Sequence, residues 1–165
     1  MDFLALAQAC APSVAPSTMA SIVNVESGYN PLAIAVVGGR LARQPRSVAE
    51  AVATAEQLEK AGWNFSIGIA QINRHNLPKY KIGYADAFDA CTNLRVGSKI
   101  LEECFVRASK GRSDSQAALR AAFSCYYSGN FTRGFSPDDA GKPSYVEKVL
   151  RSAAIPVRQI KRATP

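Results

Sequence analysis

The stretch SIVNVESGYNP, residues 21–31, ends a helical pattern on a carboxylate. An apolar stripe begins at Met19 and reaches Glu26 at the i, i+3, i+4 and i+7 spacing of one helix face. Pro16 is typical of the first turn of a helix, and Gly28 is typical of the position that follows its end. The pattern therefore predicts a helix from Pro16 to just before Gly28, whose core-facing side carries an acid in its last turn.

The position of Glu26 predicts a raised pKa. Burial of an ionised carboxylate without a partner costs several kcal/mol, so a buried acid tends to keep its proton. The carbonyl end of a helix disfavours an anion by roughly 0.3–1 kcal/mol as well. A glutamate whose pKa is raised in this way can serve as a general acid near neutral pH. The alternative is a surface carboxylate on a helix that is rotated differently, or one that is paired with an arginine.

The segment SIGIAQIN, residues 66–73, has little charge and predicts a sugar-binding strand. If it is extended, Gln71 and Asn73 point to the same side, and two amides on one face suit the hydroxyl and N-acetyl groups of a sugar. The small residues Gly68 and Ala70 would let a ligand approach the backbone closely. The alternative is an edge strand whose polar side chains face solvent.

A third stretch, FSCYYSGNF, places Tyr126 on the buried stripe of a helix that ends at Gly129. Tyr126 lies near the C-terminal end of its helix, as Glu26 does. A buried tyrosine hydroxyl needs a hydrogen-bond partner, and a carboxyl group is a good one. We therefore expect Tyr126 to face Glu26. The alternative is a core tyrosine that is bonded to a backbone carbonyl.

The other patterns predict a mainly helical α+β chain with a minor β element. Residues 30–45 are read as a small β-hairpin that turns at Gly38-Gly39, and residues 77–90 as mostly loop with room for one helical turn. We expect a single domain over residues 1–153 and a basic, disordered tail over residues 154–165. Further helices are expected at about residues 3–9, 47–61, 89–108, 113–128 and 144–153. Residues 47–50 have the sequence of a capping box, and the long helix that ends near residue 108 begins at either Asp89 or Thr92.

The composition is that of a basic globular protein. The chain has 165 residues, is 47% hydrophobic and carries a formal net charge of +7. Such a charge favours anionic partners, although an ordinary basic surface explains it equally well. No apolar stretch approaches the ~20 residues of a membrane-spanning helix, and no nucleic-acid recognition motif is present. We therefore expect no nucleic-acid binding, no stable membrane insertion and a monomer.

The four cysteines predict two disulfides in an oxidising compartment. Cys10, Cys91, Cys104 and Cys125 form no CxxC pair, and His75 is the only histidine, so we expect no metal site. Cys91 and Cys104 would lie about 20 Å apart along one helix, too far for a bond. Two pairings stay open, 10–91 with 104–125 or 10–104 with 91–125. The alternative is four free thiols in a cytosolic protein.

These stretches together resemble the lytic transglycosylases of the lysozyme-like superfamily. The chain is most similar to the transglycosylase subunits of type IV secretion systems, from about Leu4 to Leu150. Ala70 and Tyr127 depart from the family pattern, because many relatives have methionine and asparagine there. The four matching motifs are Glu26-Ser27, Gly68-Ile69-Ala70-Gln71, Cys125-Tyr126-Tyr127-Ser128-Gly129 and Tyr145-Val146-Glu147-Lys148-Val149.

The resemblance implies a lysozyme-like fold, with helices and a small β-hairpin element around a cleft. It implies cleavage in peptidoglycan of the β-1,4 bond between N-acetylmuramic acid and N-acetylglucosamine, with a 1,6-anhydro product. Glu26 would act first as the acid and then as the base, and Tyr145 would line the cleft. A periplasmic location, other secretion subunits as partners and no cofactor are implied as well. The residues that would position the sugar and the acid are Ser27, Gln71, Asn73 and Tyr126.

The acidic residues themselves support a mechanism with one carboxylate. Ordinary glycosidases use two, and substrate-assisted enzymes are an exception. The best second candidates, Asp138 and Asp139, lie in a polar loop with Gly and Pro nearby. A single Glu26 fits a route in which the N-acetyl group of the substrate assists. The alternatives are a muramidase that admits water, and a peptidoglycan-binding scaffold subunit with little turnover.

Overall fold

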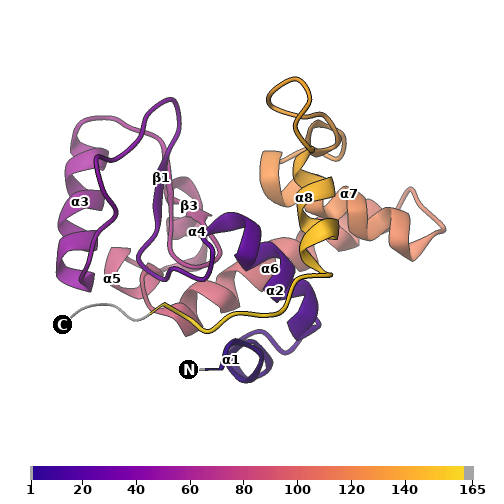
Figure 1. Ribbon diagram of the computed structural model, residues 1–165, viewed down its shortest axis with the longest axis horizontal. Coiled ribbons are helices and arrows are strands. Elements are labelled where there is room, and N and C mark those ends of the chain that lie inside the picture. Colours follow the sequence, from indigo (N-terminus) through magenta and orange to yellow (C-terminus); the bar gives the residue numbers. More distant parts are fainter. Residues whose placement is uncertain (1, 162–165) are drawn as a thin grey trace.

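Helices and a small antiparallel sheet make up the computed structural model, which describes residues 2–161 (Figure 1). This arrangement confirms the mainly helical α+β class. The strands are β1 (Ile34–Val36), β2 (Phe65–Ile67) and β3 (Ile72–Asn73), with 3-10 turns η1 (Arg74–Asn76) and η2 (Arg133–Phe135). The helices are α1 (Phe3–Cys10), α2 (Pro16–Glu26), α3 (Val48–Lys60), α4 (Leu77–Tyr80), α5 (Tyr84–Ala87), α6 (Ala90–Ser109), α7 (Ser115–Ser128) and α8 (Tyr145–Ser152).

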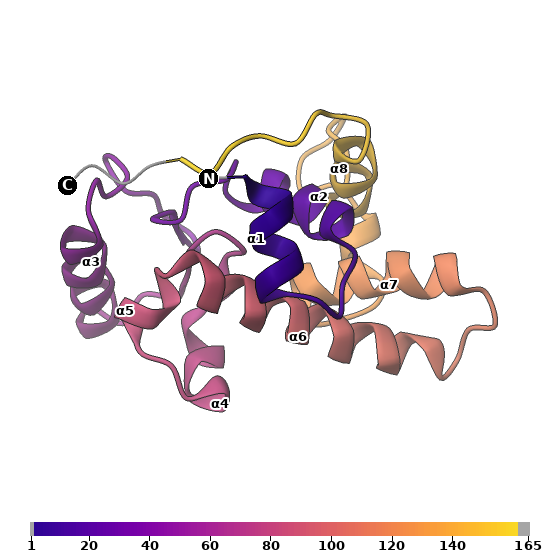
Figure 2. The same cartoon turned by 90° about the horizontal axis from the view of Figure 1, so that it is seen from below.

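The long helix α6 joins the two sides of the molecule. It packs against α1, α5, α7 and β3, and Figure 2 shows α6 and α7 running side by side. The side chain of Asp89 accepts a hydrogen bond from the backbone of Thr92, so the helix begins after Asp89, the first of the two predicted starts. α3, α5 and the sheet lie on one side, and α7 and α8 lie on the other (Figure 1). Both sides are therefore positioned by one helix. Its buried face includes Asn93, Leu94, Gly97, Leu101, Cys104 and Ala108.

The predicted hairpin at Gly38 is wrong. The strands pair in the order β1-β2-β3, with Ile34 opposite Ile67, so the partner of β1 comes from about thirty residues further along the chain. The side chain of Gln44 accepts a hydrogen bond from the backbone N–H of Ile34 (2.8 Å) and donates one to its carbonyl (2.9 Å). One amide side chain thus takes the place of the second hairpin strand. The hairpin of this fold is β2–β3, which turns through residues 68–71.

The elements around the sheet follow the predictions with smaller differences. The predicted α3 begins as expected, because Ser47 Oγ accepts a hydrogen bond from the backbone of Glu50 (3.2 Å). Glu50 itself bonds to the backbone of Arg46 rather than to that of Ser47. The expected loop over residues 77–90 contains the short helices α4 and α5. The prediction allowed for one helical turn here and the structure has two, because a single turn gives little periodic signal.

The cysteines form two disulfides and settle the choice between the two pairings. Cys10 is bonded to Cys91, which ties α1 to the first turn of α6. Cys104 is bonded to Cys125, which ties α6 to α7. Both disulfides therefore attach a neighbouring helix to the one that positions the two sides of the molecule.

The chain end predicted to be a disordered tail is described only as far as residue 161. Up to that point it has no helix or strand beyond α8, and the backbone of Lys161 donates a hydrogen bond to the carbonyl of Tyr29 (3.0 Å). Residues 162–165 lie outside the described part, so the domain boundary stays a prediction. No helix among residues 2–161 is long and apolar enough to cross a membrane.

The two disulfides should differ in their effect on stability. Cross-links that close longer loops remove more entropy from the unfolded chain, and the sequence separations are 81 residues for Cys10–Cys91 and 21 for Cys104–Cys125. We expect the paired variant Cys10→Ala/Cys91→Ala to lose about 4 kcal/mol of unfolding free energy, against about 3 kcal/mol for Cys104→Ala/Cys125→Ala. Urea unfolding of both variants measures the difference, and the reverse order would contradict the loop-entropy explanation.

Candidate active site

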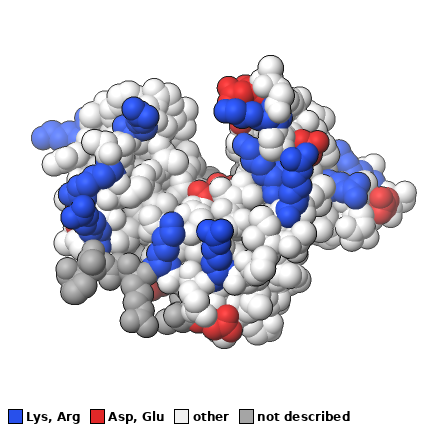
Figure 3. Space-filling view, in the orientation of Figure 1, with Lys and Arg blue, Asp and Glu red and all other residues white. Residues whose placement is uncertain are grey.

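A cavity of about 370 Å³ contains Glu26 and three of the other residues that the sequence singles out, Gln71, Asn73 and Tyr126. The sheet supplies one wall, with Ser66 among its residues, and the end of α7 supplies another. Figure 3 shows the hollow between the two sides of the molecule, with acidic atoms on its floor. The structure therefore brings together segments that lie up to a hundred residues apart in the sequence.

Glu26 is the last residue of α2, as predicted, and burial raises the pKa of its carboxyl group from 4.5 to about 7. The hydroxyl of Tyr145 donates a hydrogen bond to Oε1 (2.5 Å), which stabilises the ionised form and opposes part of that rise. Among the described residues that line the cavity, Glu26 is the only acid. The site thus holds a single carboxyl group that is close to half-protonated at neutral pH.

The prediction that Tyr126 partners the carboxyl group is wrong. Its hydroxyl donates to the backbone carbonyl of Ala70 (2.6 Å), and Tyr145 is the residue that bonds to Glu26. Gly97 of α6 permits this approach, because a Cβ at that position would lie 3.0 Å from the Tyr126 hydroxyl and 2.9 Å from Ala70 Cβ. Tyr126 therefore anchors the turn beside the acid instead of the acid itself.

Gln71 and Asn73 both line the cavity, but not as neighbours on one strand face. Gln71 precedes β3 and has a φ of 53°, a left-handed conformation that is uncommon for a residue with a side chain. Its amide Nε2 donates to the carbonyls of Ala33 (3.1 Å) and Gly68 (2.9 Å). Its Oε1 is buried and has no hydrogen-bond partner in the part of the chain that the structure describes. An acceptor in this state is ready for a donor from a ligand.

Ser27 connects the acid to the same turn. Its hydroxyl donates to the carbonyl of Ile69 (2.7 Å), so the residue that follows Glu26 is fixed to the β2–β3 turn. Ser27 is not among the residues that line the cavity. Its geometry is that of a positioning residue rather than a sugar contact. The carbonyl of Ile69 thus accepts from Ser27 at the end of α2, and the carbonyl of Ala70 accepts from Tyr126 of α7. These two hydrogen bonds hold the turn from two sides.

The comparisons with known proteins agree with this geometry. The family model described as the transglycosylase SLT domain matches residues 3–140. The chain belongs to the SLT transglycosylase family. This membership confirms the predicted family and the enzyme class of lytic transglycosylase. It also confirms the lysozyme-like fold class.

Relatives that share most of this SLT domain are named virB1, and those from Brucella are named as type IV secretion system proteins. The type IV secretion system protein virB1 of Brucella suis is 64% identical over 161 residues, which cover 97% of this chain and 67% of the relative. The relative from Brucella abortus, with the same name, matches to the same extent. The protein virB1 of Agrobacterium fabrum is 36% identical over 154 residues, which cover 92% of this chain and 59% of the relative. No solved structure matches the chain.

Tyr127, which departs from the common SLT pattern, belongs to a cluster that the sequence does not reveal. Its ring stacks on that of Tyr145, with centroids 4.6 Å apart and an interplanar angle of 11°. Its hydroxyl donates to both carboxylate oxygens of Asp138 (2.7 and 2.8 Å), and Arg133 pairs with the same carboxylate (2.7 Å). Tyr127 thus supports the tyrosine that bonds to Glu26. Asp138, considered as a second acid, is occupied by these contacts and does not line the cavity.

Asn93 is the positioning residue that sequence reasoning missed. It is completely buried in α6, where its amide accepts from the backbone of Ala70 (2.8 Å) and donates to the carbonyls of Ile67 (3.1 Å) and Ala87 (2.7 Å). A Cβ at Gly68 would lie 2.1 Å from this amide, so only glycine fits there. The sequence offers one signal for this role, an asparagine beside the apolar stripe of a long helix. An amide that is buried there must find hydrogen-bond partners, which indicates a positioning residue.

The Tyr145 hydrogen bond gives the first prediction for this site. Because the bond stabilises the carboxylate, Tyr145→Phe should raise the pKa of Glu26 above its value of about 7. Carbon-13 NMR titration of the side-chain carboxyl group measures the shift. Tyr126→Phe is the matched control, since that hydroxyl bonds to Ala70 and should leave the titration nearly unchanged. Equal midpoints in wild type and Tyr145→Phe would contradict this account.

A second prediction concerns stability against pH. The native carboxyl of Glu26 binds a proton more tightly than the unfolded one, so the free energy of unfolding falls as pH rises from about 4.5 to about 7. Glu26→Gln removes this penalty and should be more stable than wild type by roughly 3 kcal/mol at pH 8, with little difference near pH 4. Chemical unfolding at both pH values tests this, with exposed Glu102→Gln as the charge-loss control. A gain that does not vary with pH would rule out linkage to Glu26.

Proposed function

We propose that this chain cleaves the β-1,4 bond between N-acetylmuramic acid and N-acetylglucosamine in peptidoglycan, with Glu26 as the only acid and base. The observation that carries the proposal is the cavity carboxyl group whose pKa is about 7, with no second acid among the described lining residues. A pair of carboxylates is the usual requirement of glycosidases. A single one suits a reaction in which groups of the substrate replace the second.

In the first step, protonated Glu26 gives its proton to the glycosidic oxygen as the bond from that oxygen to C1 breaks. The N-acetyl oxygen of the muramic residue attacks C1 from the other side and replaces a protein nucleophile. The carboxylate that results accepts the hydrogen bond of Tyr145, which stabilises the new charge. The pKa of about 7 suits this exchange, because both protonation states are accessible at neutral pH.

In the second step, the C6 hydroxyl of the same muramic residue attacks C1 and releases the N-acetyl oxygen. Glu26 takes the hydroxyl proton, which restores the acid and leaves a 1,6-anhydro sugar. No water is consumed, so the product differs from a hydrolysis product by one water molecule. The buried Oε1 of Gln71 is the acceptor for a sugar N–H or hydroxyl, and Asn73 supplies a second amide at the cavity wall. Tyr126 and Ser27 hold the turn that carries Gln71.

The same proposal gives the enzyme a place in the cell. The names of the Brucella relatives point to a type IV secretion system, where local opening of the cell wall would admit the assembling apparatus. Two disulfides fit the oxidising periplasm, where peptidoglycan lies. We propose that the chain acts there as a monomer that contacts other secretion subunits.

Digestion of purified peptidoglycan with product masses resolved tests the reaction. We expect muropeptides lighter than hydrolysis products by one water, and a rate for Glu26→Gln that is lower by about 10³-fold or more. Asp139→Asn is the control, since that exposed acid pairs with Lys142 and should keep full activity. Reducing-end products would indicate a muramidase. Binding without any product would indicate a scaffold subunit, and full activity of Glu26→Gln would overturn the proposed mechanism.

A further inference from the structure

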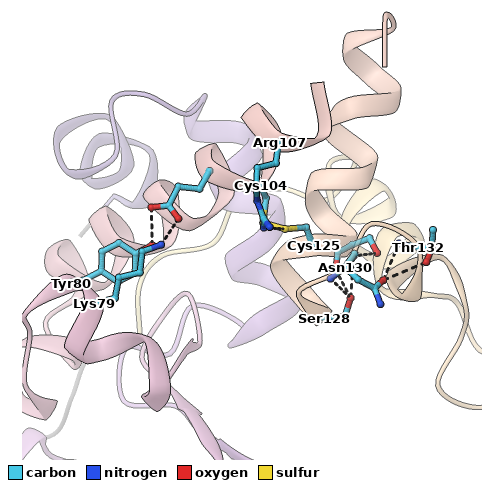
Figure 4. The surroundings of a disulfide bond; sticks show 10 residues. Lys79, Tyr80, Cys104, Arg107, Cys125, Ser128, Asn130 and Thr132 are labelled. Atoms are coloured by element: carbon cyan, nitrogen blue, oxygen red, sulfur yellow. Dashed lines mark hydrogen bonds and ion pairs between the residues drawn. A yellow bond between two sulfur atoms is a disulfide. The ribbon is translucent and has the colours of Figure 1, made fainter. Parts of the chain in front are cut away.

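A second cavity, of about 420 Å³, adjoins the active-site cavity. Its far end is formed by α4, by the C-terminal half of α6 and by the Cys104–Cys125 disulfide (Figure 4). The charged residues there are Lys79, Glu103 and Arg107. A substrate that fills the first cavity can therefore extend into the second. The residues that line both cavities are Asn64, Asn73, Asn76, Ile100, Tyr126 and Tyr127.

Arg107 is held in place by uncharged groups. Its Nη2 lies 3.0 Å from Cys125 Sγ and 3.7 Å from Cys104 Sγ, and its Cζ lies 5.6 Å from the ring centroid of Phe131. Figure 4 shows the side chain directed at the disulfide. Within residues 2–161, no carboxylate lies within ion-pair distance of its guanidinium. The cavity therefore presents a positioned cation whose remaining N–H donors are available to an anion.

The other two charged groups satisfy each other. Lys79 donates a hydrogen bond to Glu103 Oε2, and the hydroxyl of Tyr80 donates to Oε1 (3.2 Å). The carboxylate of Glu103 is thus engaged by both oxygens before any ligand enters. Two cations against one carboxylate leave the end of this cavity with a net positive charge, and Arg107 is the cation that is not hydrogen-bonded to the carboxylate. A site with this net positive charge favours a ligand with an anionic group.

We propose that this second cavity binds a carboxylate of the peptide stem of peptidoglycan, with Arg107 as the binding residue. The inference rests on the proposed function. The two sugars of the glycan repeat carry no free carboxylate when stems are attached, because the lactyl group is then in amide linkage to the peptide. The stems therefore supply the carboxylates nearest to a strand in the active-site cavity. A planar guanidinium suits them, since it can donate two parallel hydrogen bonds to one carboxylate.

Binding measurements on Glu26→Gln, which leaves a ligand uncleaved, test the proposal directly. The ligands are the disaccharide with its lactyl carboxylate amidated, the disaccharide with its tetrapeptide stem, and the stem-bearing compound with its stem carboxylates amidated. We expect the stem to improve Kd by about tenfold, the effect of one charge-assisted hydrogen bond, and amidation to remove the gain. Arg107→Gln should abolish the gain while affinity for the bare disaccharide stays unchanged.

Two further variants keep the test informative. Arg112→Gln is the matched control, because Arg112 lies 5.2 Å from the same Phe131 ring but does not line the cavity, and it should keep the gain. Glu103→Gln removes the only negative charge among the described residues that line this cavity and should tighten binding of the stem-bearing ligand. Thiol alkylation checks that the neighbouring disulfide is intact in Arg107→Gln. If the disulfide is broken in Arg107→Gln, the Glu103→Gln variant decides the test: tighter binding of the stem-bearing ligand supports the inference, and weaker or unchanged binding overturns it.

Cleavage assays with the wild-type Glu26 separate this inference from the proposed function. A stem-dependent gain in affinity that requires Arg107 supports the inference, whether or not the strands are cleaved. If neither stem-bearing nor stem-free strands are cleaved, only the proposed function is overturned. Equal affinity for bare and stem-bearing ligands overturns the inference while cleavage can still stand. An equal loss on both ligands in Arg107→Gln also overturns it, because Arg107 would then have a purely structural role.

Discussion

The buried amide of Asn93 holds the turn on which the candidate active site depends. It uses its oxygen and its nitrogen on three backbone groups, two of them in or beside the β2–β3 turn. With the turn fixed, its outward carbonyls are free to bond to Ser27 and Tyr126. Loss of such an amide would leave buried polar groups unpaired, at about 1–3 kcal/mol each. The acid, the turn and the end of α7 are thus positioned by one polar side chain inside an apolar helix face.

The buried position of Glu26 lowers the stability of the fold but gives the carboxyl group the pKa that its chemistry needs. Burial and the C-terminal end of α2 both favour the neutral acid, and Tyr145 limits the effect so that the pKa stays near 7. A strongly paired carboxylate would be more stable but would hold no proton to donate. The disulfides Cys10–Cys91 and Cys104–Cys125 join helices to α6 and offset the loss of stability.

Local patterns were enough to predict the helices of eight or more residues, the α+β class and the acid at the end of its stripe. Contacts across long sequence distances were not accessible in the same way. The pairing of β1 depends on Gln44 replacing a strand, and the partner of Glu26 lies 119 residues away in Tyr145. Strand alternation was expected to direct Gln71 toward the ligand. Gln71 does line the cavity, but it lies in a turn and has a left-handed backbone conformation. Periodicity reports which face is buried, whereas hydrogen-bond partners depend on the assembled fold.

Three consecutive residues at the end of α7 connect the chemistry to recognition of the substrate. Cys125 is bonded to α6 beside Arg107, Tyr126 anchors the turn that carries Gln71, and Tyr127 stacks on the tyrosine that bonds to Glu26. Successive residues on a helix point about 100° apart, so one turn can reach three different neighbours. The disulfide therefore joins α6, at the wall of the second cavity, to the helix whose last turn lines both cavities. A strand anchored by its stem in the second cavity would then be held in register with the acid in the first, which is the kind of positioning from which enzymes gain rate.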